Sequence, residues 1–485
     1  MPLIPDSSFL NYIQILDDDE IDRIYRGAVQ VLKKTGFRIQ HPMILERLQK
    51  HGAKVDFTHE VFYPTDTMIQ KLEDCVRRSA PSPKRTSLLR RRNIPGNVIT
   101  YNGTIYYDWT EGKQRAATLV DVENMLKTCH MLKEVSEFGP TLTAQDVPPI
   151  IEPIVSFALG IRITDRPVLR VELVLPEQLP YLEELDTITQ GVQVRYNYDG
   201  CAINNFTVDS RAMGCLVATW QRNGLANWEV YSCPVAGATA PVTLAGSVVV
   251  GVAETLGAWF AGWALNEEVT LTAMPCAGVM DMKTGRVLFS CPEAVMINVG
   301  IFQVFDRVLG MQAGMLADYT DAKVPGIQAM HDKMFNSLVY AWLTGQLNFQ
   351  RGTLEAGKVF SPTQMIIDCD LNDELKHLSK GMVVNDETMA LELLESMGPI
   401  KGKSFLDEDH TMTNFRKSMW YSSLMDRTNW DNEKTEREKE LIILRKAEAR
   451  WRAALMSYQQ PDIPKEKILA AEDVVRRARQ NLLPA

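Results

Sequence analysis

From about residue 120 onward, short apolar segments alternate with longer segments in which apolar residues recur at helical spacing. Segments of the first kind predict eight strands, at Val135–Gly139, Val168–Leu173, Asp199–Asn204, Trp228–Cys233, Glu268–Met274, Arg286–Ser290, Gln312–Asp318 and Gln346–Arg351. Helices are predicted between most of them, at Pro153–Arg162, Glu177–Gln190, Ser210–Asn223, Val242–Leu265, Pro292–Val308 and Ile327–Leu343. Eight strands with helical crossovers predict an α/β fold, specifically a (β/α)8 or TIM barrel, which we place at residues 126–360. One connection does not fit this pattern, because residues 275–283, between the fifth and sixth predicted strands, are too few for a full helix.

An N-terminal α+β extension is expected over residues 1–125. Asp17 to Thr35 has helical periodicity and is followed by Gly36, a residue typical of helix C-termini. Farther along, Asn102-Gly103 lies within an alternating segment, which is a strong signal for a β-hairpin.

A C-terminal helical extension is expected over residues 361–485. Its two last helices, Asp431 to Tyr458 and Pro464 to Leu482, are heavily charged. The ordinary interpretation of such helices is that their charged face contacts solvent, and the alternative is that this face contacts another subunit. We therefore expect a homo-oligomer.

Composition narrows the class of protein. A net charge of −9 over 485 residues argues against a general nucleic-acid surface. The eight cysteines and seven histidines show neither disulfide-framework nor metal-ligand spacing, so no metal site is expected. Val242 to Leu265 is apolar enough for a membrane span but carries Glu254, which predicts a buried helix instead. With no signal-peptide pattern, the chain is expected to be cytoplasmic and not membrane-bound.

The stretch from Cys233 to Gly246 predicts a ligand-binding corner. It follows an apolar strand, consists of small residues, and leads into a helix expected to start near Pro241. Short side chains let a ligand approach the backbone, and a helix N-terminus offers unpaired N–H groups. Gly237, Ala238 and Thr239 are the candidate ligand-contacting residues of this loop.

Aromatic side chains are the candidates for the wall of a pocket. Tyr107 and Trp109 follow the predicted hairpin, and Tyr231 and Phe349 lie near the carboxyl ends of predicted strands. Function in a TIM barrel sits at these ends, and aromatic faces attract a quaternary ammonium. Packing between neighbouring strands is the competing interpretation for each ring.

Polar candidates lie at the same strand ends. Asn204 and Asp318 could contact a substrate, and Arg351 could hold its carboxylate. An ion pair at the barrel rim is an equally weighted interpretation of Arg351. Neither a Gly-x-Ser-x-Gly motif nor a convincing Cys–His pair is present, so no catalytic residue is assigned.

Several of these segments resemble the trimethylamine methyltransferase (MttB) superfamily, in its members without pyrrolysine. The loop Pro234 to Gly246 is the most recognisable of them. The others follow in family order: Val31–Ile39, His51-Gly-Ala, Asp108–Thr118, Thr320–Gln328, Ser361–Asp370, and near the C-terminus Phe405-Leu, His410-Thr, Arg416, Trp420 and Asp426-Arg427. The resemblance covers nearly the whole chain.

The resemblance implies a barrel enzyme that moves a methyl group from an amine to a cobalt corrinoid held by a separate small protein. Relatives without pyrrolysine use quaternary amines such as glycine betaine, proline betaine or carnitine. The equivalent of the pyrrolysine is expected in the region Asp318 to Lys323, and His331-Asp332 stands where the family usually has Glu. The loop at Gly237 would then contact the corrinoid or the substrate.

Two other functions stay open at this point. A methyltransferase for tertiary amines would need a proton donor near the amine, for which Asp318 or His331 is the candidate. A catalytically silent betaine-binding or scaffold protein would bind the same ligand without turnover.

Overall fold

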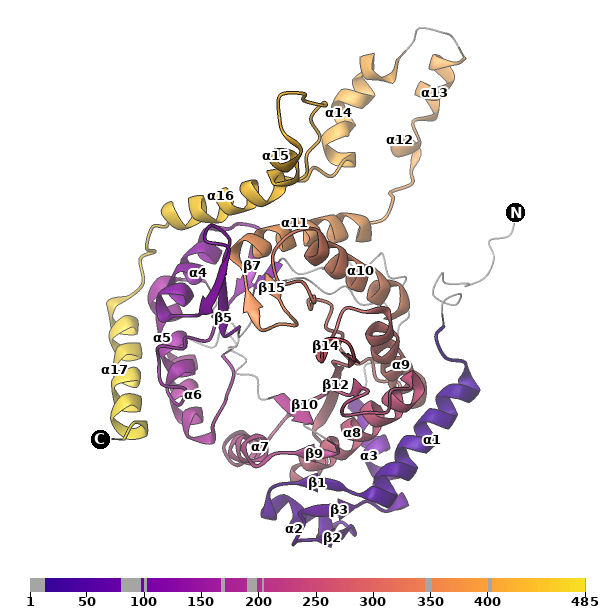
Figure 1. Ribbon diagram of the computed structural model, residues 1–485, viewed down its shortest axis with the longest axis vertical. Helices are drawn as coiled ribbons and strands as arrows, with labels where there is room; N and C mark the ends of the chain where they lie inside the picture. The colour runs from indigo at the N-terminus through magenta and orange to yellow at the C-terminus, as the bar shows by residue number, and fades with distance from the viewer. Residues whose placement is uncertain are drawn as a thin grey trace.

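The computed structural model describes residues 14–79, 97–99, 103–166, 171–189, 199–202, 205–344, 351–399 and 404–484. It is a mixed α/β structure in which helices predominate (Figure 1). Asn204 and Phe349, two of the expected site residues, lie outside the described residues. So do half of the predicted strand Val168–Leu173 and most of the predicted strand Gln346–Arg351.

Helices α4 to α11 follow one another around a ring in chain order (Figure 1). They are α4 (Leu119–Met131), α5 (Glu152–Ile163), α6 (Leu179–Ile188), α7 (Ser210–Asn223), α8 (Leu244–Leu265), α9 (Pro292–Leu309), α10 (Ile327–Thr344) and α11 (Pro362–Ser379), with a short 3₁₀ turn, η3 (Pro176–Gln178), before α6. Each packs against the next. The first and last also meet, since Cys129 Sγ of α4 lies 3.9 Å from Met365 Sδ of α11. The ring of helices is therefore closed.

Parallel strands lie inside this ring (Figure 1). β10 (Asn227–Ser232) pairs in parallel with β8 (Asp199–Ala202) on one side and β12 (Thr270–Pro275) on the other. β4 (Asn97–Ile99) pairs in parallel with β7 (Val135–Phe138). The described strands form separate sheets and do not close into a barrel.

Two of the eight predicted barrel strands are corrected. Arg286–Ser290 contains β14 (Arg286–Leu288), which pairs antiparallel with β13 (Gly278–Asp281) in a hairpin. Asp281 accepts hydrogen bonds from Lys283 N and Thr284 Oγ1 and so stabilises the turn of this hairpin. Residues 275–283, which are too few for a full helix, therefore contain the strand β13. Gln312–Asp318 forms no strand as a described element, although Gly314 N donates to Ala273 O of β12 at 2.8 Å.

The predicted hairpin at Asn102-Gly103 is also misplaced. The antiparallel pair is β5 (Ile105–Asp108) with β6 (Lys113–Ala116), so the turn lies at residues 109–112. β5 also pairs in parallel with β16 (Val359–Phe360), which pairs antiparallel with β15 (Thr353–Leu354). The hairpin thereby joins the N-terminal part of the chain to the segment before α11.

The N-terminal unit packs on the outside of the ring. It contains α1 (Asp18–Thr35), β1 (Phe37–Ile39), α2 (Pro42–Lys50), β2 (Lys54–Asp56), β3 (Val61–Tyr63) and α3 (Asp66–Ser79). Helix α1 begins with a capping box between Asp17 and Glu20, and Gly36 ends it at φ 73°. Its strand β1 pairs in parallel with β9 (Thr207–Val208), the strand that follows β8 along the chain.

Helix α8 is the one described helix long and apolar enough to cross a membrane by length and composition. Most of it is buried between α1, α9 and β10, as the sequence predicted. The helix begins at Leu244 rather than near Pro241, because Thr243 has the extended conformation of an N-cap.

C-terminal helices run over and beyond the ring (Figure 1). They are α12 (Asp386–Met389), α13 (Leu391–Met397), the 3₁₀ turn η4 (Phe405–Asp407), α14 (Asp409–Ser418), α15 (Glu436–Glu440), α16 (Ile442–Met456) and α17 (Lys465–Leu482). Helix α16 packs on α4 and α11, and α17 packs on α5 and α6.

Candidate functional site

The central parallel strands place alternate side chains on opposite faces. Trp228 and Val230 of β10 are buried on the face toward α8, where Trp228 Nε1 donates to Ala258 O at 3.1 Å. Glu229 and Tyr231 therefore point the other way, toward the inside of the ring. There Tyr231 OH donates to Glu229 Oε2 at 3.4 Å.

Three thiols meet at the carboxyl ends of these strands. Cys201 pairs with Tyr231 in the sheet register, and Cys276 N donates to Ser232 O at 2.9 Å, which brings Cys276 beside Cys233. A hydrogen bond with Cys201 lowers the pKa of Cys233, but one with Cys276 and burial together raise that pKa well above its usual range. Cys233 is therefore a neutral thiol at physiological pH and a poor nucleophile. Nowhere in the described ranges do three or more His, Cys, Asp or Glu residues form a group suited to a metal ion.

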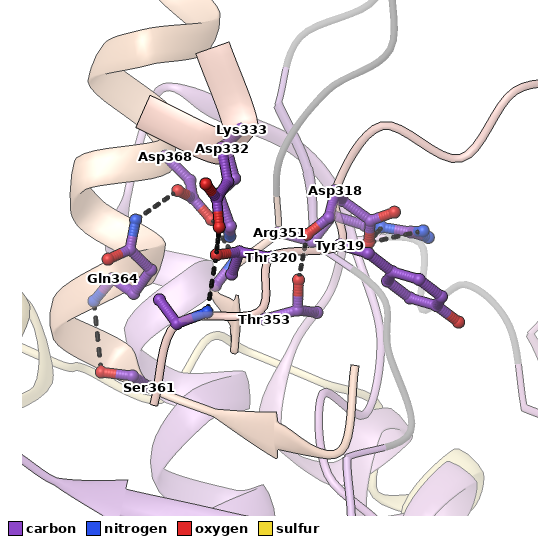
Figure 2. A network of polar contacts seen from close by, with 12 residues as sticks. Asp318, Tyr319, Thr320, Asp332, Lys333, Arg351, Thr353, Ser361, Gln364 and Asp368 are labelled. Atoms are coloured by element: carbon purple, nitrogen blue, oxygen red, sulfur yellow. Dashed lines mark hydrogen bonds and ion pairs between the residues drawn. The ribbon is translucent and has the colours of Figure 1, made fainter. Parts of the chain in front are cut away.

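A polar network lies where residues 318–322, α10 and the start of α11 meet (Figure 2). Arg351 Nε and Nη2 both donate to Asp318 Oδ2, at 3.0 and 2.9 Å. Thr353 Oγ1 donates to Asp318 O at 2.6 Å and holds the same backbone. The Asp318 side chain is 2% exposed and that of Arg351 18%. Arg351 thus forms an ion pair, with Asp318 as its partner.

A fully buried ion pair lies beside it (Figure 2). Lys333 Nζ of α10 lies 2.5 Å from Asp368 Oδ2 of α11, and neither side chain is exposed. Asp368 also accepts hydrogen bonds from Gly352 N at 2.6 Å and Gln364 Nε2 at 2.7 Å. Burial raises the pKa of Asp368, and the Lys333 ammonium opposes this effect. Gly352 has φ 85° and directly follows Arg351 in the chain, so its hydrogen bond to Asp368 connects the buried ion pair to Arg351.

The segments Thr320–Gln328 and Ser361–Asp370, which carry part of the family resemblance, both contribute to this network through neighbouring residues of α10. Thr320 Oγ1 donates to Asp332 Oδ2 at 2.8 Å, and Asp321 accepts from Phe289 N and Ser290 N. His331 Nδ1 lies 3.2 Å from Asp332 Oδ1 at the edge of this network, but the His331 side chain is 74% exposed and stacks on Phe335. Of the expected proton donors, Asp318 is therefore engaged by Arg351 and His331 faces outward.

The hairpin aromatics lie in a packed cluster. Tyr107 is 7% exposed, and it is buried with a set of small and aliphatic residues, Ala322, Ala329, Leu354 and Val359. Trp109 packs on the same cluster. This environment supports the packing interpretation of both rings. It also places the hairpin directly against the Thr320–Gln328 segment.

The small-residue loop forms a short strand and a tight turn. β11 (Val235–Ala236) pairs in parallel with β13, and Thr239 Oγ1 accepts from Val235 N at 2.9 Å. Gly237 adopts φ 84°, and a Cβ there would lie 2.6 Å from Met282 Cε. Ala238 is exposed. The β13–β14 hairpin thus covers one side of the loop, which sequence reasoning did not foresee.

Three functional candidates were missed from the sequence. Lys333 and Asp368 are 35 residues apart, so only the three-dimensional structure pairs them. A lysine within an apolar helical segment was a usable signal, because lysine is almost never fully buried unless it is paired. Glu254 was noted only as an obstacle to a membrane span, yet burial raises its pKa to about 8.

Comparison with known proteins points in one direction. A family model described as trimethylamine methyltransferase (MTTB) matches residues 7–482. The trimethylamine methyltransferase MttB of Desulfitobacterium hafniense (strain DSM 10664 / DCB-2) is 24% identical over 426 residues, covering 86% of this chain and 84% of that protein. The glycine betaine methyltransferase of Desulfitobacterium hafniense (strain Y51) is 25% identical over 471 residues, covering 93% and 94%. MttB of Methanosarcina barkeri (strain Fusaro / DSM 804) is 22% identical over 423 residues, covering 81% of each chain.

Proposed function

This methyltransferase chain belongs to the trimethylamine methyltransferase (MTTB) family, and we propose that it transfers a methyl group from a quaternary amine to the corrinoid of a separate protein in the cytoplasm. The substrate would be of the glycine betaine, proline betaine or carnitine type. One supporting observation is that a relative named glycine betaine methyltransferase aligns over 93% of this chain. Another is that residues 318–323, where we expect the pyrrolysine equivalent, are ordinary amino acids.

The observation that carries the choice of substrate class is the geometry of Arg351. Asp318 engages two of its nitrogens through a single oxygen, Oδ2, and so fixes the plane of the guanidinium. A guanidinium oriented in this way suits a planar carboxylate such as that of a betaine. Because the Arg351 side chain is only 18% exposed, a carboxylate bound there would be partly shielded from water.

The remaining chemistry makes few demands on the protein. Loss of a methyl group from a quaternary ammonium releases a neutral tertiary amine, so the leaving group needs no proton. The positive charge on nitrogen fades toward the transition state, and a tight ion pair at nitrogen would stabilise the ground state more. Aromatic faces such as that of Tyr231 hold the cation without such a pair. Orientation of the methyl group then supplies most of the acceleration.

The closed ring of helices supports a (β/α)8 barrel as the scaffold of this site. We place β4 as its first strand, so that the barrel keeps eight strands without Arg286–Ser290. β4 pairs in parallel with β7, and β8, β10 and β12 pair in parallel while each leads toward a ring helix. The barrel would then extend from β4 to α11, which is wider than residues 126–360.

The test is a methyl-transfer screen with a reduced corrinoid partner protein, followed by the absorbance of the methylated corrinoid. We expect a carboxylate-bearing quaternary amine to support methylation. Arg351→Ala should raise KM for this substrate by roughly 10- to 100-fold, because the variant loses a charged hydrogen bond to the carboxylate. Arg286→Ala, which removes an exposed ion pair with Glu355, is the matched control and should leave KM unchanged. If no quaternary amine supports methylation, the proposal is wrong.

A tertiary methylamine is the second candidate substrate, since several relatives are named trimethylamine methyltransferases. Glu254 is a further candidate for the proton donor beside Asp318 and His331, because a carboxyl with a pKa of about 8 keeps its proton at neutral pH. Methylation by trimethylamine, with a rate lost through Glu254→Gln, would support it. Binding of a betaine without any turnover would instead indicate a silent protein.

A further inference from the structure

Residues 380–399 and 404–421 form an arm that projects from the ring (Figure 1). The arm leaves the end of α11, contains α12, α13, η4 and α14, and returns toward α16. Its base is anchored, because Asp370 of α11 accepts hydrogen bonds from Ser422 Oγ and from Ser423 N. Lys446 Nζ of α16 also donates to Leu424 O at 3.2 Å. The arm is therefore held in a defined direction away from the body.

The arm exposes an unusual number of large apolar side chains. Eleven of them are at least 39% exposed: Met382, Val383, Val384, Met389, Leu391, Leu394, Phe405, Leu406, Met412, Met419 and Tyr421. Within its described residues, only Met397 is a buried apolar residue. A segment without a core of its own needs an external surface to stabilise this conformation.

The exposed area has the size of a stable interface. These eleven side chains present roughly 1,000 Å² of apolar surface, against about 800 Å² that each partner buries in a standard interface. Apolar content this high is typical of permanent interfaces, whereas surfaces for transient partners resemble the ordinary protein surface. A permanent partner that is present whenever the chain is made is another copy of the chain itself.

Two parts of the arm carry opposite charge. Helices α12 and α13 carry Asp386, Glu387, Glu392 and Glu395, and α14 ends with Arg416 and Lys417. Throughout the described part of the chain, these six side chains form no ion pair. In a two-fold arrangement, the acidic helices α12 and α13 of one arm can lie against the basic last turn of α14 of the other.

We propose that the arm is a dimerisation device, in which the described residues of the arms of two copies of this chain pack against each other around a two-fold axis. The apolar side chains form the centre of the interface, and the charged residues of α13 and α14 fix its orientation. This inference concerns assembly and holds whichever amine is the substrate.

Light scattering coupled to size-exclusion chromatography tests the proposal on the full chain. The native chain should have twice the mass of one chain at micromolar concentration. Leu391→Lys with Leu394→Lys should weaken dimerisation at least tenfold and shift it toward the monomer, while circular dichroism stays unchanged. Val120→Lys, which alters an exposed apolar residue on α4, is the control and should remain a dimer.

Charge reversal separates a specific interface from damage to the fold. Glu392→Lys with Glu395→Lys should weaken dimerisation, and so should Arg416→Glu with Lys417→Glu. The variant that carries all four changes should dimerise again, because the charges on both sides of the interface are then reversed and attract each other as before. A native chain that is monomeric, or an oligomer unaffected by every change on the arm, would overturn the proposal.

Discussion

Glu254 is an acidic residue in the middle of the apolar helix α8. Its side chain is 3% exposed, and its one hydrogen bond with a described residue is a long one, 3.5 Å from Phe206 N. Burial with so little compensation raises its pKa from 4.5 to about 8. The sequence revealed the position of this residue but not its environment, which depends on the packing of α8 against β8 and β9.

Glu254 should make the protein less stable as the pH rises. In the unfolded chain the carboxyl loses its proton near pH 4.5, whereas in the folded chain it keeps it until about pH 8. The stabilisation is therefore complete below pH 4.5 and is lost progressively up to about pH 8. Glu254→Gln should flatten this dependence and stabilise the protein by a few kcal/mol at pH 8.5. Urea unfolding at pH 5.5 and 8.5 measures both effects.

The surface variant Glu268→Gln is the control for this experiment, because the Glu268 side chain is 78% exposed. It should leave the pH dependence of the wild type in place. If Glu254→Gln shows the same slope as the wild type between the two pH values, Glu254 is not the protonated group.

Helix α8 shows at the scale of one element why small residues recur along a helix. A Cβ on Gly257 would lie 2.1 Å from Phe37 Cδ2 of β1, and one on Gly262 would lie 2.6 Å from Trp228 Cδ1. Glycine here is required by the close approach of β1 and β10, not by the backbone conformation. The small-residue character of the helix follows from what packs on it.

The same substitution should therefore have opposite effects in two helices. Gly257→Ala should destabilise the protein by about 1–3 kcal/mol through overpacking against Phe37. Gly27→Ala in α1 should stabilise it by about 0.5–1 kcal/mol, because the nearest atom to its Cβ would be Val249 Cγ2 at 3.8 Å. Thermal unfolding of the two variants compares them directly. A stabilised Gly257→Ala variant would contradict this account of the helix.

At the scale of the whole molecule, the C-terminal helices act as a belt on the ring. Helix α16 connects α11 to α4, and its buried Glu448 accepts hydrogen bonds from Thr363 of α11 and Thr110 of the hairpin. Helix α17 covers α5 and α6 with Ala471, Val474 and Ala478. Residues at opposite ends of the chain thus stabilise one another.

Disrupting the belt should destabilise the ring even though the site lies elsewhere. Val474→Asp places a charge at a position with no exposure, and should cost several kcal/mol and lower Tm by several degrees. Leu469→Asp on the same helix alters a side chain that is 54% exposed, and should leave Tm nearly unchanged. Calorimetry on both variants measures the difference. Equal values of Tm would show that α17 does not contribute to the stability of the ring.

Local patterns in the sequence were sufficient for the elements that depend on neighbouring residues. The periodicity and capping residues of α1, the all-round apolar character of α8 and the parallel strands β10 and β12 could be predicted, because propensity, capping and burial act over a few residues. Family membership could be recognised as well, since segments such as Pro234 to Gly246 keep their order along the chain.

The tertiary structure decided everything that depends on distant partners. Arg286–Ser290 has the pattern of a barrel strand, but its neighbour β13 makes it half of a hairpin. Arg351 could have been a substrate anchor alone, and it is Asp318, 33 residues away, that orients it. Lys333 meets Asp368 only because α10 packs on α11. Contacts between distant residues leave no periodic signal in the sequence, so the polar network of the site had to be seen in three dimensions.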